Sequence, residues 1–156
     1  MKKRKIGFNT KILRKPHTLV CESWVSKSPK SQRGASQTQI LFDYRGKKFI
    51  IDVDKCDFFS RIRGLMFRSK ESAEALLLLD SKKPIKLGIH SLFVFFSFIA
   101  IWLDDQDKIV DLLVVKPFTL FIKTKNPFNK LIEIPINKKY SKIAQLLCSQ
   151  FHSSRC

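Results

Sequence analysis

The chain of 156 residues has few of the residues that interrupt or cross-link a fold. It holds only 5 glycines and 6 prolines, which excludes a collagenous or linker-dominated protein. Its four cysteines form no C-x-x-C pair, and none has a histidine at a zinc-ligand spacing: Cys21, Cys56, Cys148 and Cys156. We therefore expect reduced thiols in a cytoplasmic protein, with no metal site and no cofactor.

Motifs of the common catalytic and nucleotide-binding families are also missing. Neither G-x-x-x-x-G-K nor G-x-G-x-x-G occurs, and there is no nucleophile elbow with a serine, histidine and acid in order. His90 is the single histidine inside the expected domain, and the sequence places no nucleophile or orienting acid beside it. We predict no catalytic residues and lean against an enzyme.

Acidic residues are scarce, with 13 Asp and Glu against 30 Lys and Arg, so the formal net charge is +17. Residues 1–39 alone carry ten basic residues and one acid, Glu22. Such a balance favours polyanionic partners. A lysine-rich proteome would produce the same excess without any specific partner.

Residues 1–38 are expected to form a basic, flexible extension, because they are too polar to bury a core. No apolar stretch typical of a secretory signal follows the basic start. Phosphate contacts with non-specific nucleic acid are one hypothesis for its cations, among them Lys2, Lys3, Arg4, Lys5, Arg14 and Lys15.

What the sequence has in abundance is apolar surface: 44% of residues are hydrophobic and 14 are phenylalanine. Two β-rich runs, Ile40–Phe42 and Phe49–Ile51, flank a turn that contains Gly46 and predict a hairpin. Further strands are predicted at Ala75–Leu79, Ile109–Val115 and Leu131–Ile136, with Pro135 at an edge or a strand end.

Asp57 is placed to cap a short helix that Gly64 ends with a left-handed residue. Phe58 and Ile62 would share one face of this helix. The three residues after the glycine, Leu65 to Phe67, should return to the core.

The run Leu87–Leu103 contains no charged residue and could in principle cross a bilayer. Its β-branched and aromatic residues, and the acid-rich turn that follows it, favour buried strands instead. We therefore do not favour a membrane partner, although membrane association stays an open alternative.

Together these patterns predict a small α+β domain, mainly antiparallel, with a curled or barrel-like sheet, a short helix after the first hairpin and a C-terminal helix. The β-rich domain should span residues 39–137, and residues 138–156 should hold the C-terminal helix and tail. Ile143, Leu146, Leu147 and Phe151 would face inward on that helix.

Several motifs occur in order along this region. They are Arg61-x-Arg63-Gly64-Leu65-Met66-Phe67-Arg68, then His90–Val94 leading into Phe98–Asp104, then Ile109–Asp111 with Lys116–Thr119, and last Leu131–Pro135. In this order and spacing the chain resembles the domain of unknown function 192 family. The resemblance implies a compact β-rich domain and no defined activity. At Ala100 the chain lacks the aspartate of the family pattern, so any ligand contact of that side chain would be lost.

The leading functional hypothesis is a non-enzymatic binding or accessory module of unknown oligomeric state. Arg63, Gly64, Arg68 and His90 would rim an apolar pocket for a small anionic ligand. Helix-end charge complementation would explain the arginines without a ligand. Nucleic-acid association through residues 1–38 is the alternative function.

Overall fold

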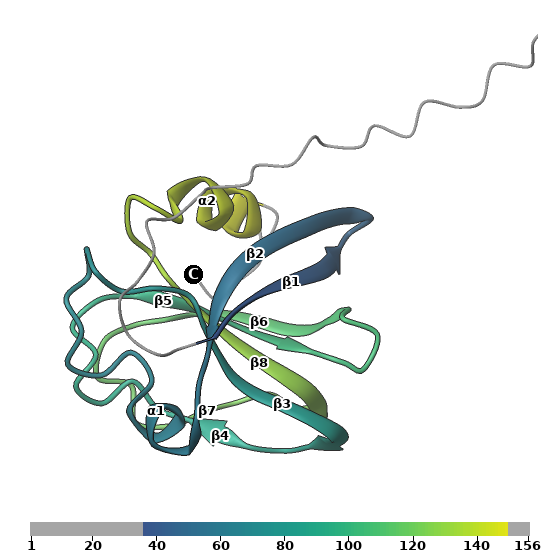
Figure 1. The fold of residues 1–156 in the computed structure, drawn as a ribbon, viewed down its shortest axis with the longest axis horizontal. Coiled ribbons are helices and arrows are strands. Elements are labelled where there is room, and N and C mark those ends of the chain that lie inside the picture. Colours follow the sequence, from purple (N-terminus) through teal and green to yellow (C-terminus); the bar gives the residue numbers. More distant parts are fainter. Residues whose placement is uncertain (1–35, 150–156) are drawn as a thin grey trace, which may run out of the picture.

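The computed structural model describes residues 36–149, which form the α+β domain that the sequence predicts (Figure 1). Eight strands and two helices are found in this part of the chain. Their bounds are β1 Gln37–Tyr44, β2 Lys47–Lys55, α1 Phe58–Arg63, β3 Leu76–Ile85, β4 Gly88–Ile89, β5 Phe98–Leu103, β6 Ile109–Val115, β7 Ile122–Lys123, β8 Phe128–Pro135 and α2 Ser141–Ser149.

Six of these strands form one curled sheet in the order β1-β2-β3-β8-β5-β6, and β4 pairs with β7 in a separate ribbon. All neighbours in the large sheet are antiparallel except β2 and β3, so the sheet is mixed. Its two edge strands approach each other where the backbone N–H of Asp43 donates to the carbonyl of Asp107 at 3.2 Å. This contact gives the sheet the partly closed, barrel-like shape that was expected.

The central strands are buried on both faces. Successive side chains of a strand point to opposite faces, and all six residues of β5 are buried. Ile99 and Ile101 face a cluster formed with the β1–β2 hairpin and α2. Phe98 and Trp102 face a second cluster that includes Leu65. We call these the inner face and the outer face; in Figure 1, α2 lies at the top and α1, β4 and β7 lie at the bottom.

The short helix α1 begins at the predicted cap and ends at Gly64, but the conformation of this glycine differs from the predicted left-handed one. The Asp57 carboxylate accepts a hydrogen bond from the backbone N–H of Ser60 at 2.8 Å. Gly64 follows the last helical residue with φ +49° and ψ −128°, a conformation open mainly to glycine rather than the ordinary left-handed one. Phe58 and Ile62 are exposed, so this helix buries no apolar stripe.

One expectation for the following turn is wrong. Leu65 is buried as predicted, but 67% of Phe67 is exposed. Phe67 has a φ of +58°, and the resulting change of chain direction points its side chain away from the core.

The uncharged run Leu87–Leu103 is confirmed as strands and loops, since it contains β4 and β5 and no helix. Within residues 36–149, neither helix has the length and apolar character needed to cross a membrane.

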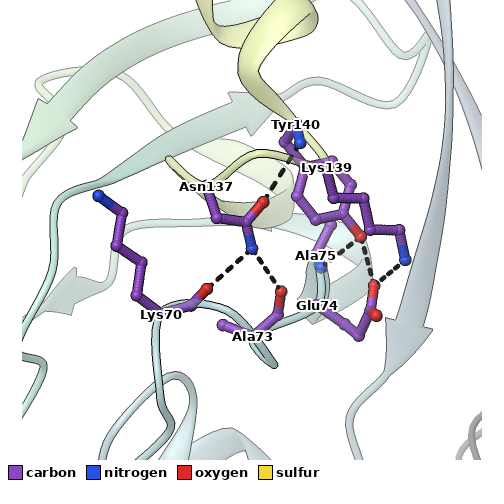
Figure 2. A network of polar contacts seen from close by, with 7 residues as sticks. All are labelled: Lys70, Ala73, Glu74, Ala75, Asn137, Lys139 and Tyr140. Atoms are coloured by element: carbon purple, nitrogen blue, oxygen red, sulfur yellow. Dashed lines mark hydrogen bonds and ion pairs between the residues drawn. The ribbon is translucent and has the colours of Figure 1, made fainter.

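A buried polar network joins α2 to the loop before β3 (Figure 2). The side-chain amide of Asn137 donates to the carbonyls of Lys70 and Ala73 at 2.9 and 3.0 Å. The Tyr140 hydroxyl donates to a carboxylate oxygen of Glu74 at 2.6 Å and accepts from the backbone N–H of Ala75 at 3.0 Å. The loop that follows Arg68 is thereby fixed to the C-terminal segment.

The C-terminal helix is confirmed over Ser141–Ser149, the last of the described residues. Ala144 and Leu147 are buried, whereas Leu146 is half-exposed rather than inward, and Phe151 lies outside the described residues.

Candidate functional site

Glu133 is the one buried carboxylic acid among residues 36–149, and it lies within the apolar outer face of the sheet. Glu133 stands on the central strand β8, directly opposite Leu76 of β3 and Ala100 of β5. Its neighbours in sequence, Ile132 and Ile134, point to the inner face, so alternation directs Glu133 outward. Only 4% of its surface is exposed.

Burial dominates the chemistry of this carboxyl group. It raises the pKa of Glu133 to about 8, and the positive charge of Arg68 opposes the shift only in part. Within residues 36–149 no group donates a hydrogen bond to the carboxyl oxygens. Glu133 is therefore mostly protonated at neutral pH and has an O–H to donate.

The Gly64 turn covers this carboxyl group. A Cβ atom built on Gly64 would lie 3.3 Å from Oε2 of Glu133 and 3.7 Å from Cδ2 of Leu78. The positive φ of Gly64 and the carboxyl group behind it are therefore two separate reasons for a glycine at this position. The turn and the acid form one structural unit.

Two further ionisable groups lie close enough to Arg68 to be affected by its charge. Burial raises the pKa of the Cys56 thiol to about 11, against the influence of Arg68. Burial also raises the pKa of Asp54, with Glu74 contributing and Arg68 opposing. Because Cys56 is a free thiol that stays protonated at neutral pH, it is not an activated nucleophile.

The structure brings some of the predicted site residues together. Gly64 is buried over Glu133, and Arg68, four residues later, is partly buried and acts electrostatically on Glu133. Arg63 is exposed at the end of α1. His90 is exposed in the loop after β4. The basic residues proposed for nucleic-acid contact, at positions 2 to 15, lie outside the described residues.

The segments that carry these residues are neighbours. The backbone N–H of Phe67 donates to the carbonyl of Phe93 at 3.0 Å, which joins the Gly64 turn to the loop that contains His90. No contact between His90 and the two arginines is recorded, so the common rim of a pocket stays a prediction. No group of three or more metal-ligating side chains occurs within the described chain.

Sequence reasoning missed Glu133, which is the centre of this site. The segment Leu131–Pro135 is apolar apart from the glutamate, and this composition is typical of a strand that is buried on both faces. A single acid in such a strand was the available signal.

The fold and the site define a small curled-sheet α+β domain with one protonated carboxyl group beneath a glycine turn. A UPF0127 protein from Pyrococcus furiosus is 33% identical over 92 residues, which is 58% of this chain and 78% of that protein. A UPF0127 protein from Thermococcus sibiricus is 30% identical over 79 residues, 51% of each chain. The chain belongs to the uncharacterised UPF0127 family. No family model matches it.

Solved structures share the fold at low sequence identity. A protein of unknown function from Novosphingobium aromaticivorans has a TM-score of 0.60 at 12% identity, covering 75% of this chain and 85% of that one. A protein described provisionally as a transcription regulator from Sinorhizobium meliloti has a TM-score of 0.58 at 13% identity, covering 73% and 91%. These likenesses concern the fold alone.

Proposed function

We propose that this domain is a non-enzymatic binding module that takes a small anionic ligand at the Gly64 turn. The protonated carboxyl group of Glu133 would donate a hydrogen bond to the ligand, and Arg68 would supply the positive charge. The observation that carries the proposal is the carboxyl group of a residue that is only 4% exposed in the apolar outer face, and this group is influenced electrostatically by Arg68.

The energetic argument for a ligand is that Glu133 destabilises the domain. A buried acid that the fold keeps protonated weakens the folded state at neutral pH, because the unfolded chain would release the proton. Stability would be better served by an apolar side chain in this position. A group retained at such a cost is typical of a functional site.

The surroundings favour an anion over a cation. Near neutral pH the site contains a neutral acid, a neutral thiol, the charged Arg68 and the Asp54 carboxyl group that the same arginine influences. Arg63 and His90 are exposed on the adjoining segments and would face the approaching ligand. Guanidinium groups bind carboxylates and oxyanions through charge-assisted hydrogen bonds.

Sulfate binding measured by calorimetry tests the proposal, because the charge of sulfate stays constant over the pH range of interest. We expect affinity to fall as Glu133 ionises above pH ~8, since the new negative charge repels the ligand. Arg68→Met should weaken binding by about tenfold or more.

The matched control is Lys82→Met, which removes an exposed cation of β3 that lies outside the site. Glu133→Gln keeps the shape and neutrality of the acid, so it should bind sulfate with no loss of affinity above pH ~8. If Arg68→Met and Lys82→Met behave alike in a folded protein, the proposal is wrong.

A finer family relationship is part of the proposal. The order of the motif that ends at Arg68, the His90 block and the Leu131–Pro135 block supports membership of the domain of unknown function 192 family. In that pattern the missing aspartate corresponds to Ala100, which lies directly opposite Glu133. Glu133 would then be the single carboxyl group left at this position of the sheet.

Nucleic-acid association through the basic N-terminal extension is the second candidate. The ten cations against one acid in residues 1–39 support it. Binding of single-stranded DNA should fall steeply with salt and weaken when Lys2, Lys3, Arg4 and Lys5 are replaced by glutamine. Binding that is insensitive to salt, or equally reduced by Lys82→Gln with Lys83→Gln, would exclude it.

A further inference from the structure

Three exposed phenylalanines hold the backbone in a conformation that bulky residues avoid. Phe67, Phe93 and Phe118 have φ values of +58°, +59° and +59°. Positive φ is rare for side chains of this size. About half or more of each side chain is nevertheless exposed, so burial of these rings does not compensate for the strain. Strained residues of this kind concentrate at functional surfaces.

A buried serine fixes two of these turns against each other. The Ser91 hydroxyl donates to the carbonyl of Lys116 and accepts from the backbone N–H of Thr119, both at 2.7 Å. The Ser91 carbonyl accepts from the backbone N–H groups of Val94 and Phe118, both at 3.1 Å. The loops that carry Phe93 and Phe118 are therefore built to present their side chains in a set arrangement.

Ring contacts form two pairs among these residues and their neighbours in the loops. Phe67 stacks on Phe93 with ring centroids 5.1 Å apart, and Phe95 meets the ring of Phe118 edge-on at 5.5 Å. Leu120 and Phe121 continue the same loop, 71% and 68% exposed. We call the set of Phe67, Phe93, Phe95, Phe118, Leu120 and Phe121 the phenylalanine surface.

The loop segments that carry this surface hold charges of one sign, although Asp57 and Glu71 directly flank the first of them. The segments that carry it, residues 58–70, 86–97 and 116–128, contain eight Lys or Arg and no Asp or Glu. The ammonium group of Lys123 lies 5.3 Å from the ring centroid of Phe121. An occupant that matches both features must be apolar in its interior and anionic at its boundary.

We infer that the phenylalanine surface docks on an anionic lipid membrane, with its rings in the acyl boundary and its cations among the headgroups.

Other partners fit this surface less well. A second copy of this chain would oppose cations to cations without an acid to pair with them. Protein hot spots are rich in Trp, Tyr and Arg; these segments contain arginines but neither of the two aromatic types. Single-stranded nucleic acid is bound by aromatic rings that stack on its bases, and the aliphatic side chain of Leu120 cannot stack in this way, although it can insert into a membrane. From the sequence, the only membrane feature to evaluate was the uncharged run Leu87–Leu103 as a transmembrane segment. The side chains of the phenylalanine surface come from separate loops, which the fold brings together.

Co-sedimentation of the full chain with phosphatidylglycerol-containing vesicles tests the inference. Leu120→Ser with Phe121→Ser removes two exposed side chains and should lower partitioning about tenfold or more. The matched control is Leu41→Ser with Ile50→Ser, an exposed cross-strand pair on the first hairpin that is 47% and 50% exposed. The control should bind as the wild type does, and neither should bind phosphatidylcholine alone.

An assay of insertion into the bilayer distinguishes binding through this surface from binding through the positive charge of the N-terminal extension. A Phe121→Trp variant should show a blue-shifted emission with anionic vesicles and quenching by brominated acyl chains, whereas Leu41→Trp should show neither. Equal partitioning of the two double variants, or no quenching at position 121, would overturn the inference. The double variant of Leu120 and Phe121 should also be tested for oligothymidine binding and for self-association. If it loses either of these while it still binds vesicles, the surface serves another partner and the inference is overturned. The anion site can fail its own test without affecting this result.

Discussion

The two faces of the sheet differ in chemistry although the same strands build both. The inner face packs against the β1–β2 hairpin and α2, and Tyr140 of its cluster donates a hydrogen bond to the Glu74 carboxylate. The outer face contains Glu133 and the Trp102 indole, whose Nε1 has no hydrogen-bond partner among the described residues. Regular elements cover the inner face, and loops cover much of the outer face. The polar group of the inner face is therefore hydrogen-bonded, whereas within residues 36–149 the outer face holds the unpaired Trp102 N–H and the buried Glu133, and it is the face on which we propose the ligand site.

The largest expected contrast comes from placing the same residue at two neighbouring positions of β8. Ile134→Gln introduces an unpaired amide on the inner face and removes packing, so it should destabilise the domain by about 3–5 kcal/mol. Glu133→Gln should be neutral or stabilising by up to about 3 kcal/mol at neutral pH, because it removes the proton-linked cost of the acid while its buried amide offsets part of this gain. Urea denaturation of both variants measures the difference. Similar losses in the two would remove the distinction between the faces.

The second largest loss of stability should come from adding a methyl group at Gly64. Gly64→Ala forces alanine into positive φ and presses its Cβ toward Glu133, so we expect a loss of about 2–4 kcal/mol. Gly46→Ala is the control, with φ +74° and no atom within 4 Å of the added Cβ. It should lose only about 1 kcal/mol. Equal losses in thermal or urea unfolding would mean that the turn does not close on the acid.

A pH-dependent difference of intermediate size should follow from Glu133. Its folded pKa, about 8, lies above the ordinary value of 4.5, so between these limits the folded state holds a proton that the unfolded state has released. The contribution of Glu133 to the free energy of unfolding is therefore fully present below pH 4.5. Between pH 4.5 and about 8 it falls by about 1.4 kcal/mol for each pH unit. Comparing the wild type with Glu133→Gln isolates this slope from other groups. Parallel pH curves for the two proteins would contradict the assignment.

The smallest expected effect concerns Trp102. Trp102→Phe removes a buried N–H without a partner, which offsets part of the packing that is lost with the smaller ring. We expect a net change within about 1 kcal/mol. A loss of more than about 3 kcal/mol, typical of deleting a well-satisfied buried aromatic, would show that the indole N–H is paired in solution.

Local patterns in the sequence predict much of this fold. The hairpin around Gly46, the Asp57 cap and the positive φ of Gly64 depend on neighbouring residues, and the structure agrees with each. Order along the chain does not determine strand order, however. The parallel pairing of β2 with β3 and the central place of β8 arise from long-range packing.

The candidate site follows the same division. Gly64 and Arg68 were identified from their motif, whereas Glu133 comes from a strand 69 positions after Gly64 in the sequence. Its significance depends on burial that only the assembled sheet creates. Phe67 was misplaced for a related reason: its exposure depends on a backbone turn that hydrophobicity does not reveal.

A carbon-detected NMR titration of the Glu133 side-chain carboxyl group tests the central claim most directly. We predict an apparent pKa near 8, because burial in the outer face outweighs the opposing charge of Arg68. A value near the ordinary 4.5 of a solvated glutamate would mean that the group is ionised and hydrated at neutral pH, and the proposed anion site would fail with it.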